Sequence, residues 1–302
     1  MRKRLSISVV AGVASGALCW FLLRHFHQGA ADFGWAIRAA QYLLRGRNPY
    51  DTPLQQYPAT AAVFALPFVL LSAEMAAGIF FGLSSALLAF GVTAEGYEGL
   101  LVFFAYPYWA AMLTAQWSPL ILAAGFLPWL LPAAMAKPQV GFPVAFTRMS
   151  RTGLLACLAV LVATLLWMPS WPLLWWLQLA NYQHFFPLLV LPGPLLLLAL
   201  LRWRDRDAVV LLLMAVMPQR WFFDAFVLWL IPKTRREWLA AAGFSWGAGI
   251  WRWYHQPQNF TQVGRWAVLW IYLPMLGIIL FRKKQANAGG QEWWRTSPGG
   301  SS

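Results

Sequence analysis

The polar residues with the clearest chemical potential lie around position 32, just after the first apolar segment. Asp32 follows that segment, and His25 and His27 precede it by a few residues. A carboxylate in this position can act as a general base on the hydroxyl group of an acceptor. It can instead cap a helix that starts at residue 33, by accepting hydrogen bonds from free amide groups. The spacing favours the cap, and the two roles are compatible.

Lys137 is the second residue of interest, because it interrupts the apolar stretch between Leu120 and Phe146. Charged groups within or beside a membrane are costly, so an ammonium here is a candidate contact for a lipid-linked phosphate. The alternative is that the lysine extends to the membrane interface, as lysines near helix ends do. Pro138 leaves a backbone carbonyl without its helical partner, which favours a polar cavity. The two interpretations are about equally supported.

Other polar residues are weaker candidates. Arg220 and Asp224 are four residues apart, so on a helix they share a face and predict a structural ion pair. His184 and His255 can carry protons, although a lone loop histidine is more often ordinary polar surface. The full set of candidate substrate-binding residues is Lys137, Gln139, Tyr57, Arg220, Arg252, His184 and His255.

The sequence contains little that indicates a metal or an organic cofactor. His25 and His27 near Asp32 are the only histidine cluster, and their spacing is a weak signal for a metal. The chain has no glycine-rich phosphate loop, no Ser–His–Asp order and no CxxC pair. Its two cysteines, Cys19 and Cys157, both lie within apolar runs. We therefore expect neither a metal nor a cofactor.

The composition of the chain indicates the class of fold that positions these residues. The 302 residues are 60% hydrophobic and only 11% charged, with a formal net charge of +13. Soluble domains carry about 25% charged residues, so the composition excludes an ordinary soluble enzyme, a disordered protein and a disulfide scaffold. The basic residues form short clusters between apolar runs, which is typical of membrane topology signals and argues against nucleic-acid binding. We predict an all-α polytopic membrane protein.

Apolar runs and basic clusters together predict the topology. A spanning helix needs about 20 apolar residues, and shorter runs can cross inside a bundle. Five clear runs are 6–24, 75–93, 117–135, 152–168 and 266–281, and seven shorter ones are 59–72, 100–114, 138–147, 188–201, 208–217, 221–232 and 238–251. Alternating sides from a cytoplasmic N-terminus places most basic residues inside, as the positive-inside rule requires.

These runs predict one transmembrane domain over residues 1–284, with about 10–12 spanning helices and both termini in the cytoplasm. A Gly-, Ser- and Pro-rich tail over residues 285–302 is expected to be disordered. The first outer loop, residues 25–58, is the longest. Within it residues 32–46 have the spacing of an amphipathic helix, with Gly46 as its stop, which we expect to lie on the outer leaflet.

Three phrases of the sequence resemble glycosyltransferase family 87, the polyprenol-phosphate-mannose-dependent α-mannosyltransferases of the C-type membrane fold. The phrase from Asp32 to Pro58, DFGWAIRAAQYLLRGRNPYD…YP, is similar to the family's opening motif. The segment from Ala115 to Leu120 is similar to its GQ-x-N-x-LL segment, and residues 136–139 match its LKPQ phrase. The likeness covers residues 5 to about 150 well and the remainder loosely.

The resemblance implies a polyprenyl-phosphate sugar donor, an active site on the outer face and an acidic base that maps onto Asp32. It also strengthens Lys137 as a contact for the donor phosphate. The sequence departs from the family where Ala59 replaces the second proline of YPP and where Ala115 replaces the glycine of GQ-x-N. The chain is also shorter than the usual member.

We therefore predict a membrane glycosyltransferase, in a bacterial inner membrane, that moves a sugar, mannose by the resemblance, to a hydroxyl of a lipid or glycan acceptor. Its expected partners are the polyprenyl-phosphate donor, the acceptor and membrane lipids. Transfer would occur by direct displacement with inversion. The alternatives are a transporter or flippase of lipid-linked intermediates, a non-catalytic membrane scaffold, and a lipid-linked polymerase or ligase that uses the same outer cavity.

Overall fold

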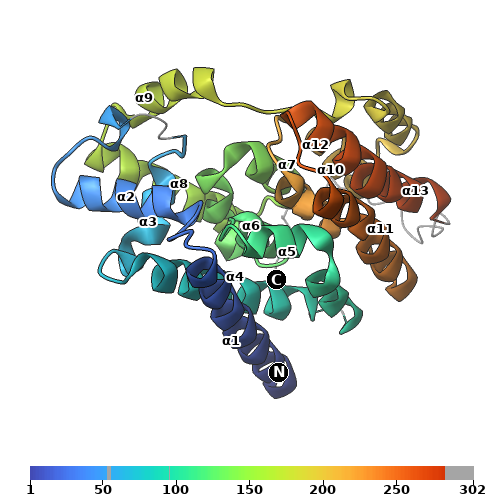
Figure 1. Ribbon diagram of the computed structural model, residues 1–302, viewed down its shortest axis with the longest axis horizontal. Coiled ribbons are helices and arrows are strands. Elements are labelled where there is room, and N and C mark those ends of the chain that lie inside the picture. Colours follow the sequence, from blue (N-terminus) through green and yellow to red (C-terminus); the bar gives the residue numbers. More distant parts are fainter. Residues whose placement is uncertain (53–55, 95, 283–302) are drawn as a thin grey trace, which may run out of the picture.

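The computed structural model describes residues 1–52, 56–94 and 96–282, and these residues are organised almost entirely as helices (Figure 1). A single backbone bridge between Phe185 and Gln219 is the β-type pairing among them. The prediction of an all-α chain is confirmed for this part of the sequence. The predicted tail, residues 285–302, lies outside the described residues.

The helices follow one another with short connections. The α-helices are α1 (Arg2–His25), α2 (Phe33–Leu44), α3 (Thr60–Ala65), α4 (Ala73–Val92), α5 (Tyr106–Met112), α6 (Ser118–Ala124), α7 (Pro138–Arg148), α8 (Arg151–Trp167), α9 (Trp171–Gln178), α10 (Arg206–Val216), α11 (Arg235–Tyr254), α12 (Phe260–Ala267) and α13 (Leu273–Phe281). The 3₁₀ segments are η1 (Pro49–Asp51), η2 (Leu66–Phe68), η3 (Glu98–Phe104), η4 (Pro128–Ala136), η5 (Leu179–Asn181), η6 (Pro187–Leu189), η7 (Gly193–Arg202) and η8 (Phe222–Leu230), and a π-helical turn, η9 (Val268–Tyr272), joins α12 to α13.

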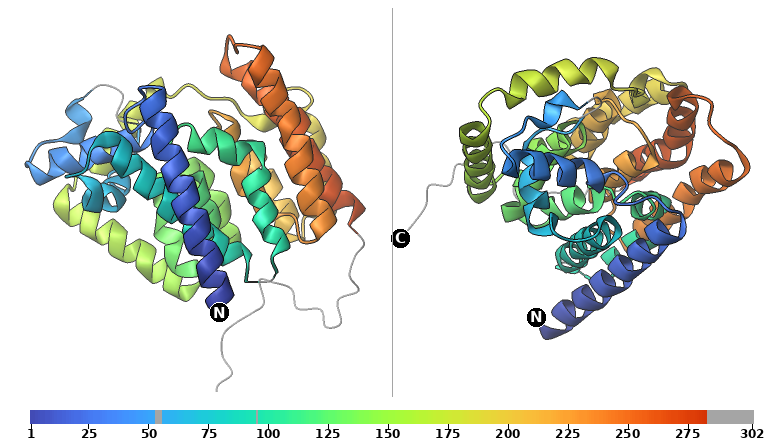
Figure 2. Two further views of the ribbon diagram at one scale, coloured as in Figure 1. Left: turned by 60° about the horizontal axis from the view of Figure 1, so that its bottom comes forward. Right: turned by 60° about the vertical axis from the view of Figure 1, so that its left-hand side comes forward.

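Three helices in the described part of the chain are long and apolar enough to cross a bilayer. They are α1, α4 and the continuous helix Phe260–Phe281 formed by α12, η9 and α13. The pair α8 and α9 adds a fourth only if its 94° bend lies within one span. In the left view of Figure 2, α1 and the red-orange C-terminal helices cross the molecule in the same general direction. The predicted count of about 10–12 spanning helices is therefore not confirmed.

Proline accounts for much of this difference. The apolar run 117–135 was expected to be one helix, and this prediction is wrong: α6 ends at Ala124 and η4 begins at Pro128. A proline has no amide hydrogen and clashes with the preceding turn, so it interrupts an α-helix. In the run 59–72, α3 gives way to the short 3₁₀ segment η2, which contains Pro67. The segment that contains Pro194 is the 3₁₀ segment η7.

The closest helix packing joins α1 to α4 through glycines. A methyl group added at Gly82 would lie 2.8 Å from the Gly12 carbonyl oxygen and 3.1 Å from the Gly16 Cα atom. Gly78 is equally crowded, with the Gly16 carbonyl oxygen 3.0 Å from an added Cβ. Glycines four residues apart on both helices allow close backbone approach, which is common between helices that pack in lipid.

Gly82→Leu is expected to destabilise the protein by about 1–3 kcal/mol, because the larger side chain must push α1 away from α4. Gly243→Leu is the matched control, since an added Cβ at this helical glycine of α11 meets nothing within 4 Å. Unfolding of both variants in detergent, followed by circular dichroism, measures the effect. Equal stability of the two variants would contradict the close packing of α1 on α4.

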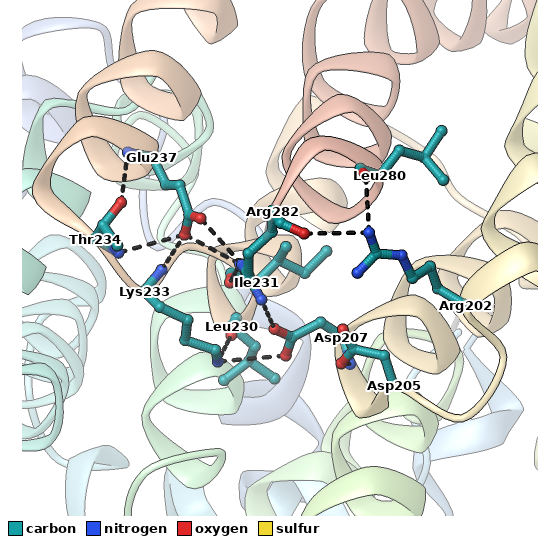
Figure 3. Close-up of polar contacts among 10 residues, drawn as sticks. All are labelled: Arg202, Asp205, Asp207, Leu230, Ile231, Lys233, Thr234, Glu237, Leu280 and Arg282. Carbon is teal, nitrogen blue, oxygen red and sulfur yellow. Dashed lines mark hydrogen bonds and ion pairs between the residues drawn. The ribbon is translucent and has the colours of Figure 1, made fainter. Parts of the chain in front are cut away.

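A network of charged residues ties together the ends of α10, α11, η8 and α13 (Figure 3). The Arg282 guanidinium contacts Asp207 at 2.7 Å and Glu237 at 3.0 Å, and it donates to the Ile231 carbonyl at 2.6 Å. Lys233 lies 3.3 Å from Asp207. Lys233 and Arg282 belong to basic clusters that the positive-inside rule predicts to be cytoplasmic. The network lies at the ends of α10 and η8 opposite to the site described next.

Candidate active site

The Asp32 carboxylate faces inward and does not cap α2. Asp32 has helical backbone angles, φ −67° and ψ −30°, and its side chain makes no capping hydrogen bond. A capping residue usually has an extended backbone, so the prediction of a cap is wrong. The Asp32 amide instead donates to the Thr114 carbonyl at 3.1 Å. This bond fixes the start of α2 against the turn between α5 and α6.

Gln116 in that turn connects Asp32 to Lys137. Its side-chain amide donates to the Asp32 carboxylate, and its carbonyl oxygen accepts from the Lys137 ammonium at 3.1 Å. Gln116 is fully buried and Lys137 is 4% exposed. Ala115, the residue before Gln116, has a φ of +47°, which turns the chain sharply at this point. Gln116 therefore links the Asp32 carboxylate to the Lys137 ammonium through two hydrogen bonds.

The ammonium of Lys137 is neutralised by Asp224. Its Nζ lies 2.6 Å from Oδ1 of Asp224, which is fully buried, and 4.6 Å from the centre of the Phe223 ring. The prediction that Asp224 pairs with the Arg220 side chain is wrong. Because η8 begins only at Phe222, Arg220 precedes the helix, and its backbone amide donates to Asp224 at 2.8 Å.

The Arg220 guanidinium remains available to a ligand. It donates to Gln56 at 3.1 Å and lies about 6.0 Å from the centre of the Tyr182 ring. Among the described residues, no carboxylate lies within ion-pair distance of this guanidinium, whereas Lys137 is paired. Arg220 is therefore the better placed of the two cations to bind an anionic group.

Two tyrosines on loops supply hydroxyl groups to the site. The Tyr57 hydroxyl donates to Asp32 at 3.3 Å, and the Tyr182 hydroxyl accepts from Gln139 at 3.0 Å. Burial raises the pKa of Tyr57 well above its ordinary value, and the neighbouring Asp32 carboxylate raises it further. Burial and the Asp224 carboxylate also raise the pKa of Tyr182. Both phenols therefore stay protonated at neutral pH and act as hydrogen-bond donors or acceptors, not as bases.

Two cavities meet at Asp32 and Arg220. We define cavity 1 as the space of about 300 Å³ lined by Asp32, Lys137, Gln139, Tyr182, His184, Arg220 and neighbouring apolar residues. We define cavity 2 as the space of about 770 Å³ lined by Asp32, Gln116, Arg220, Arg252 and a wall of aromatic side chains. The aromatic wall comprises Tyr106, Trp109, Trp221, Phe223, Trp246, Trp253 and Phe260. Asp32 and Arg220 are the two residues that line both spaces.

The remaining candidate residues are placed differently. His184 and Tyr57 line cavity 1 as expected, and Arg252 lines cavity 2. His255 is not part of the site: it is exposed, stacks on Trp251 and lines neither cavity. His255 lies outside both cavities because α11 ends at Tyr254 and His255 itself has an extended backbone.

Sequence reasoning missed three residues of the site. Gln116 was noted only within a phrase, and its contact with both Asp32 and Lys137 was not predicted. Asp224 was assigned to the wrong partner, and Gln56, which accepts from Arg220, was not considered. The signal that could have found Gln116 is its place in an apolar stretch, since a buried amide must have partners.

The helix α2 lies within the predicted range 32–46, but its apolar face does not have the surroundings that were expected for a helix on the outer leaflet. Its apolar residues pack against α3, η2 and α4 within the protein, so this face is not available to the outer leaflet. Phe33 stacks on Phe80 with ring centres 3.9 Å apart and also contacts Trp117. These aromatic contacts hold the start of α2, and thus Asp32, in place.

The described residues contain no group of three His, Cys, Asp or Glu side chains arranged to hold a metal ion. His27 is exposed, and Asp32 is held by Gln116 and Tyr57. Comparisons of the chain with protein-family models, with curated proteins and with solved structures each give no match. The case for a function therefore depends on the geometry and on the residues themselves.

Proposed function

We propose that the protein is an integral membrane glycosyltransferase that transfers a sugar from a polyprenyl-phosphate donor to an acceptor hydroxyl. The observation that carries the proposal is the meeting of two cavities at one carboxylate and one unpaired guanidinium. A transferase must bring two substrates to one reacting centre, and a base and a cation are the groups this reaction needs.

The phrases that resemble glycosyltransferase family 87 support the same proposal. Asp32 and Tyr57 come from the first phrase, Gln116 from the second and Lys137 from the third. Although these residues are far apart in the sequence, they form one hydrogen-bonded group. A chance likeness of three short phrases has no reason to converge on one site.

In the proposed reaction, the acceptor oxygen attacks the anomeric carbon from the side opposite to the phosphate. A new carbon–oxygen bond forms while the bond from the sugar to the phosphate oxygen breaks, and polyprenyl phosphate leaves with the electron pair. Asp32 accepts the hydroxyl proton of the acceptor. The configuration at the anomeric carbon is inverted because the displacement is direct.

In this scheme, Arg220 is the main residue that stabilises the negative charge on the leaving phosphate. The guanidinium can bind two phosphate oxygens at once and lies where the cavities meet. Lys137 acts mainly through its contacts, because its hydrogen bond to Gln116 and its ion pair with Asp224 fix the amide that holds Asp32. The donor occupies cavity 1 in this scheme and the acceptor approaches through cavity 2, where flat aromatic rings suit a sugar.

The membrane setting is part of the proposal. Three apolar helices, the glycine packing of α1 on α4 and the basic clusters support a polytopic protein with a cytoplasmic N-terminus and the site on the outer face of a bacterial inner membrane. Shorter helices would complete the bundle, since irregular backbone is tolerated where it is packed in protein.

The transporter alternative has less support. Transport through the protein would need polar groups between the site and the cytoplasmic network of Figure 3. The two charged clusters are separated by α10 and η8, whose residues 208–217 and 225–231 are all apolar. A scaffold without chemistry does not explain why a buried ion pair and a buried amide are aligned on Asp32.

Arg220→Gln is expected to weaken binding of polyprenyl phosphate by about 10–100-fold, because a charge-assisted phosphate contact contributes about 1.5–3 kcal/mol. Arg38→Gln is the control, since Arg38 is exposed on α2 and lines neither cavity. Titration of purified protein with polyprenyl phosphate in detergent measures both affinities. Equal affinities of the two variants would remove Arg220 from the phosphate site.

The direct test of the function is an assay of the wild-type protein with a panel of polyprenyl-phosphate sugars. Mass spectrometry should detect release of polyprenyl phosphate and a glycosylated product in equal amounts. A protein that binds the donor but never releases polyprenyl phosphate, with lipid-linked and free glycans offered as acceptors, would contradict the proposal.

A further inference from the structure

The chain changes direction sharply at the junction of α8 and α9. The helix axes turn by 94° within a few residues at Met168–Ser170. No Asp, Glu, Lys or Arg occurs between Arg151 and Arg202, so α8 after its first residue, α9 and the chain that follows carry none of these residues. In Figure 1, α9 forms an outer edge of the molecule beyond α8.

One edge of α9 is strongly apolar and exposed. Leu173 is 65% exposed, Trp176 is 68% exposed and Leu177 is 61% exposed. These residues follow the exposed apolar side of α8, where Leu158 is 52% exposed and Leu166 is 80% exposed. Exposed apolar side chains on two consecutive helices that meet at nearly a right angle fit a chain that crosses lipid and then lies along its boundary.

The opposite edge of α9 belongs to cavity 1. Trp175 and Leu179 line this cavity, and the Trp175 indole donates to the Gln56 carbonyl at 3.0 Å. Gln178 donates to the Tyr50 carbonyl at 3.3 Å. The helix is therefore anchored on one side to the loop that carries the site, while its other side has no protein partner among the described residues.

We infer that α9 is an interfacial helix, inserted into the outer leaflet through Leu173, Trp176 and Leu177, and that it forms the lipid-side wall of cavity 1. The inference depends on the membrane setting proposed above and names phospholipid acyl chains as the partner of this surface. A tryptophan among leucines at a helix edge is well suited to the headgroup boundary. With this wall, the chain of a lipid-linked donor would remain in the leaflet while its phosphate reaches Arg220.

Spin labels at three positions test the inference in lipid nanodiscs. Each variant carries Cys157→Ala, and Cys19 is left in place because it is buried. Leu177→Cys reports on α9, Leu158→Cys on the exposed side of α8, and Gln256→Cys on an exposed loop residue after α11. All three side chains are exposed in the protein alone, so labelling leaves the core intact. Accessibility to oxygen and to a water-soluble nickel complex gives the depth of each label.

The inference predicts that the Leu177 label lies about 5–10 Å below the headgroup boundary. The Leu158 label should be deeper and the Gln256 label should be in water. A Leu177 label as accessible to nickel as that at Gln256, with Leu158 still in lipid, would overturn the inference about α9 alone. If the Leu158 label is also accessible to nickel, both the inference about α9 and the proposed membrane setting are overturned. This outcome does not depend on whether the protein transfers a sugar.

Discussion

Asp32→Asn is expected to lower the rate of sugar transfer by about 10²–10⁴-fold, the range typical of a lost general base. The substituted amide keeps the size of the side chain and one oxygen that accepts a hydrogen bond from Gln116 or Tyr57. It cannot take a proton from the acceptor hydroxyl. Affinity for polyprenyl phosphate should change little, because Arg220 provides the main phosphate contact. Single-turnover kinetics measure the rate of sugar transfer, and titration with polyprenyl phosphate measures the affinity.

Asp51→Asn is the matched control for this prediction. Asp51 is an exposed acid in the same loop between the first two apolar runs, where it accepts a hydrogen bond from Asn48 at 2.7 Å, and it lines neither cavity. Its replacement should leave the rate of transfer nearly unchanged. An Asp32→Asn variant as active as Asp51→Asn would exclude Asp32 from the chemistry.

The second large effect is expected at the buried ion pair. Lys137→Met should destabilise the protein by about 3–5 kcal/mol, because it leaves the Asp224 carboxylate charged and without its partner in the interior. Asp224 is fully buried, and Lys137 Nζ lies 2.6 Å from it. Chemical unfolding in detergent, followed by circular dichroism, gives the change in the free energy of unfolding.

Two further variants make this prediction specific. The double variant Lys137→Met/Asp224→Leu should recover much of the lost stability, since no uncompensated charge remains. Lys233→Met serves as the control: its side chain is 40% exposed in the charged network of Figure 3, so the loss should be at most about 1 kcal/mol. Equal losses for Lys137→Met and Lys233→Met, with no recovery in the double variant, would refute the buried pair.

The double variant also separates stability from activity. Without Lys137, Gln116 loses the hydrogen bond at its carbonyl oxygen and can rotate away from Asp32. Transfer should therefore stay impaired even where folding is restored. This outcome would identify Lys137 as a residue that positions the base through Gln116.

Much of the fold followed from hydropathy and charge. The positions of α1, α4, α8 and the C-terminal helix matched the apolar runs 6–24, 75–93, 152–168 and 266–281, because an apolar run of nearly 20 residues without an internal proline, or with one near a helix start, favours a long helix. Helix lengths were predicted less well. The run 117–135 breaks at Gly125–Pro128, and local backbone geometry of this kind is not visible in average hydropathy.

The site was predicted in part for similar reasons. Asp32 and Lys137 stood out because charged residues are rare in apolar surroundings. The partner of Asp224 was predicted wrongly because the four-residue spacing was interpreted on an α-helix, whereas Arg220 precedes the 3₁₀ segment η8. Gln116 contacts Asp32, which is 84 positions away in the sequence, and Lys137, which is 21 positions away. Spacing alone cannot predict such tertiary contacts.

A structure of the protein with bound polyprenyl phosphate, solved by cryo-electron microscopy in nanodiscs, tests the central claim most directly. The account predicts the phosphate at the junction of the two cavities, in contact with the Arg220 guanidinium and within reach of the Asp32 carboxylate. A phosphate bound elsewhere, separated from Asp32 by packed helices, would contradict the sugar-transfer account.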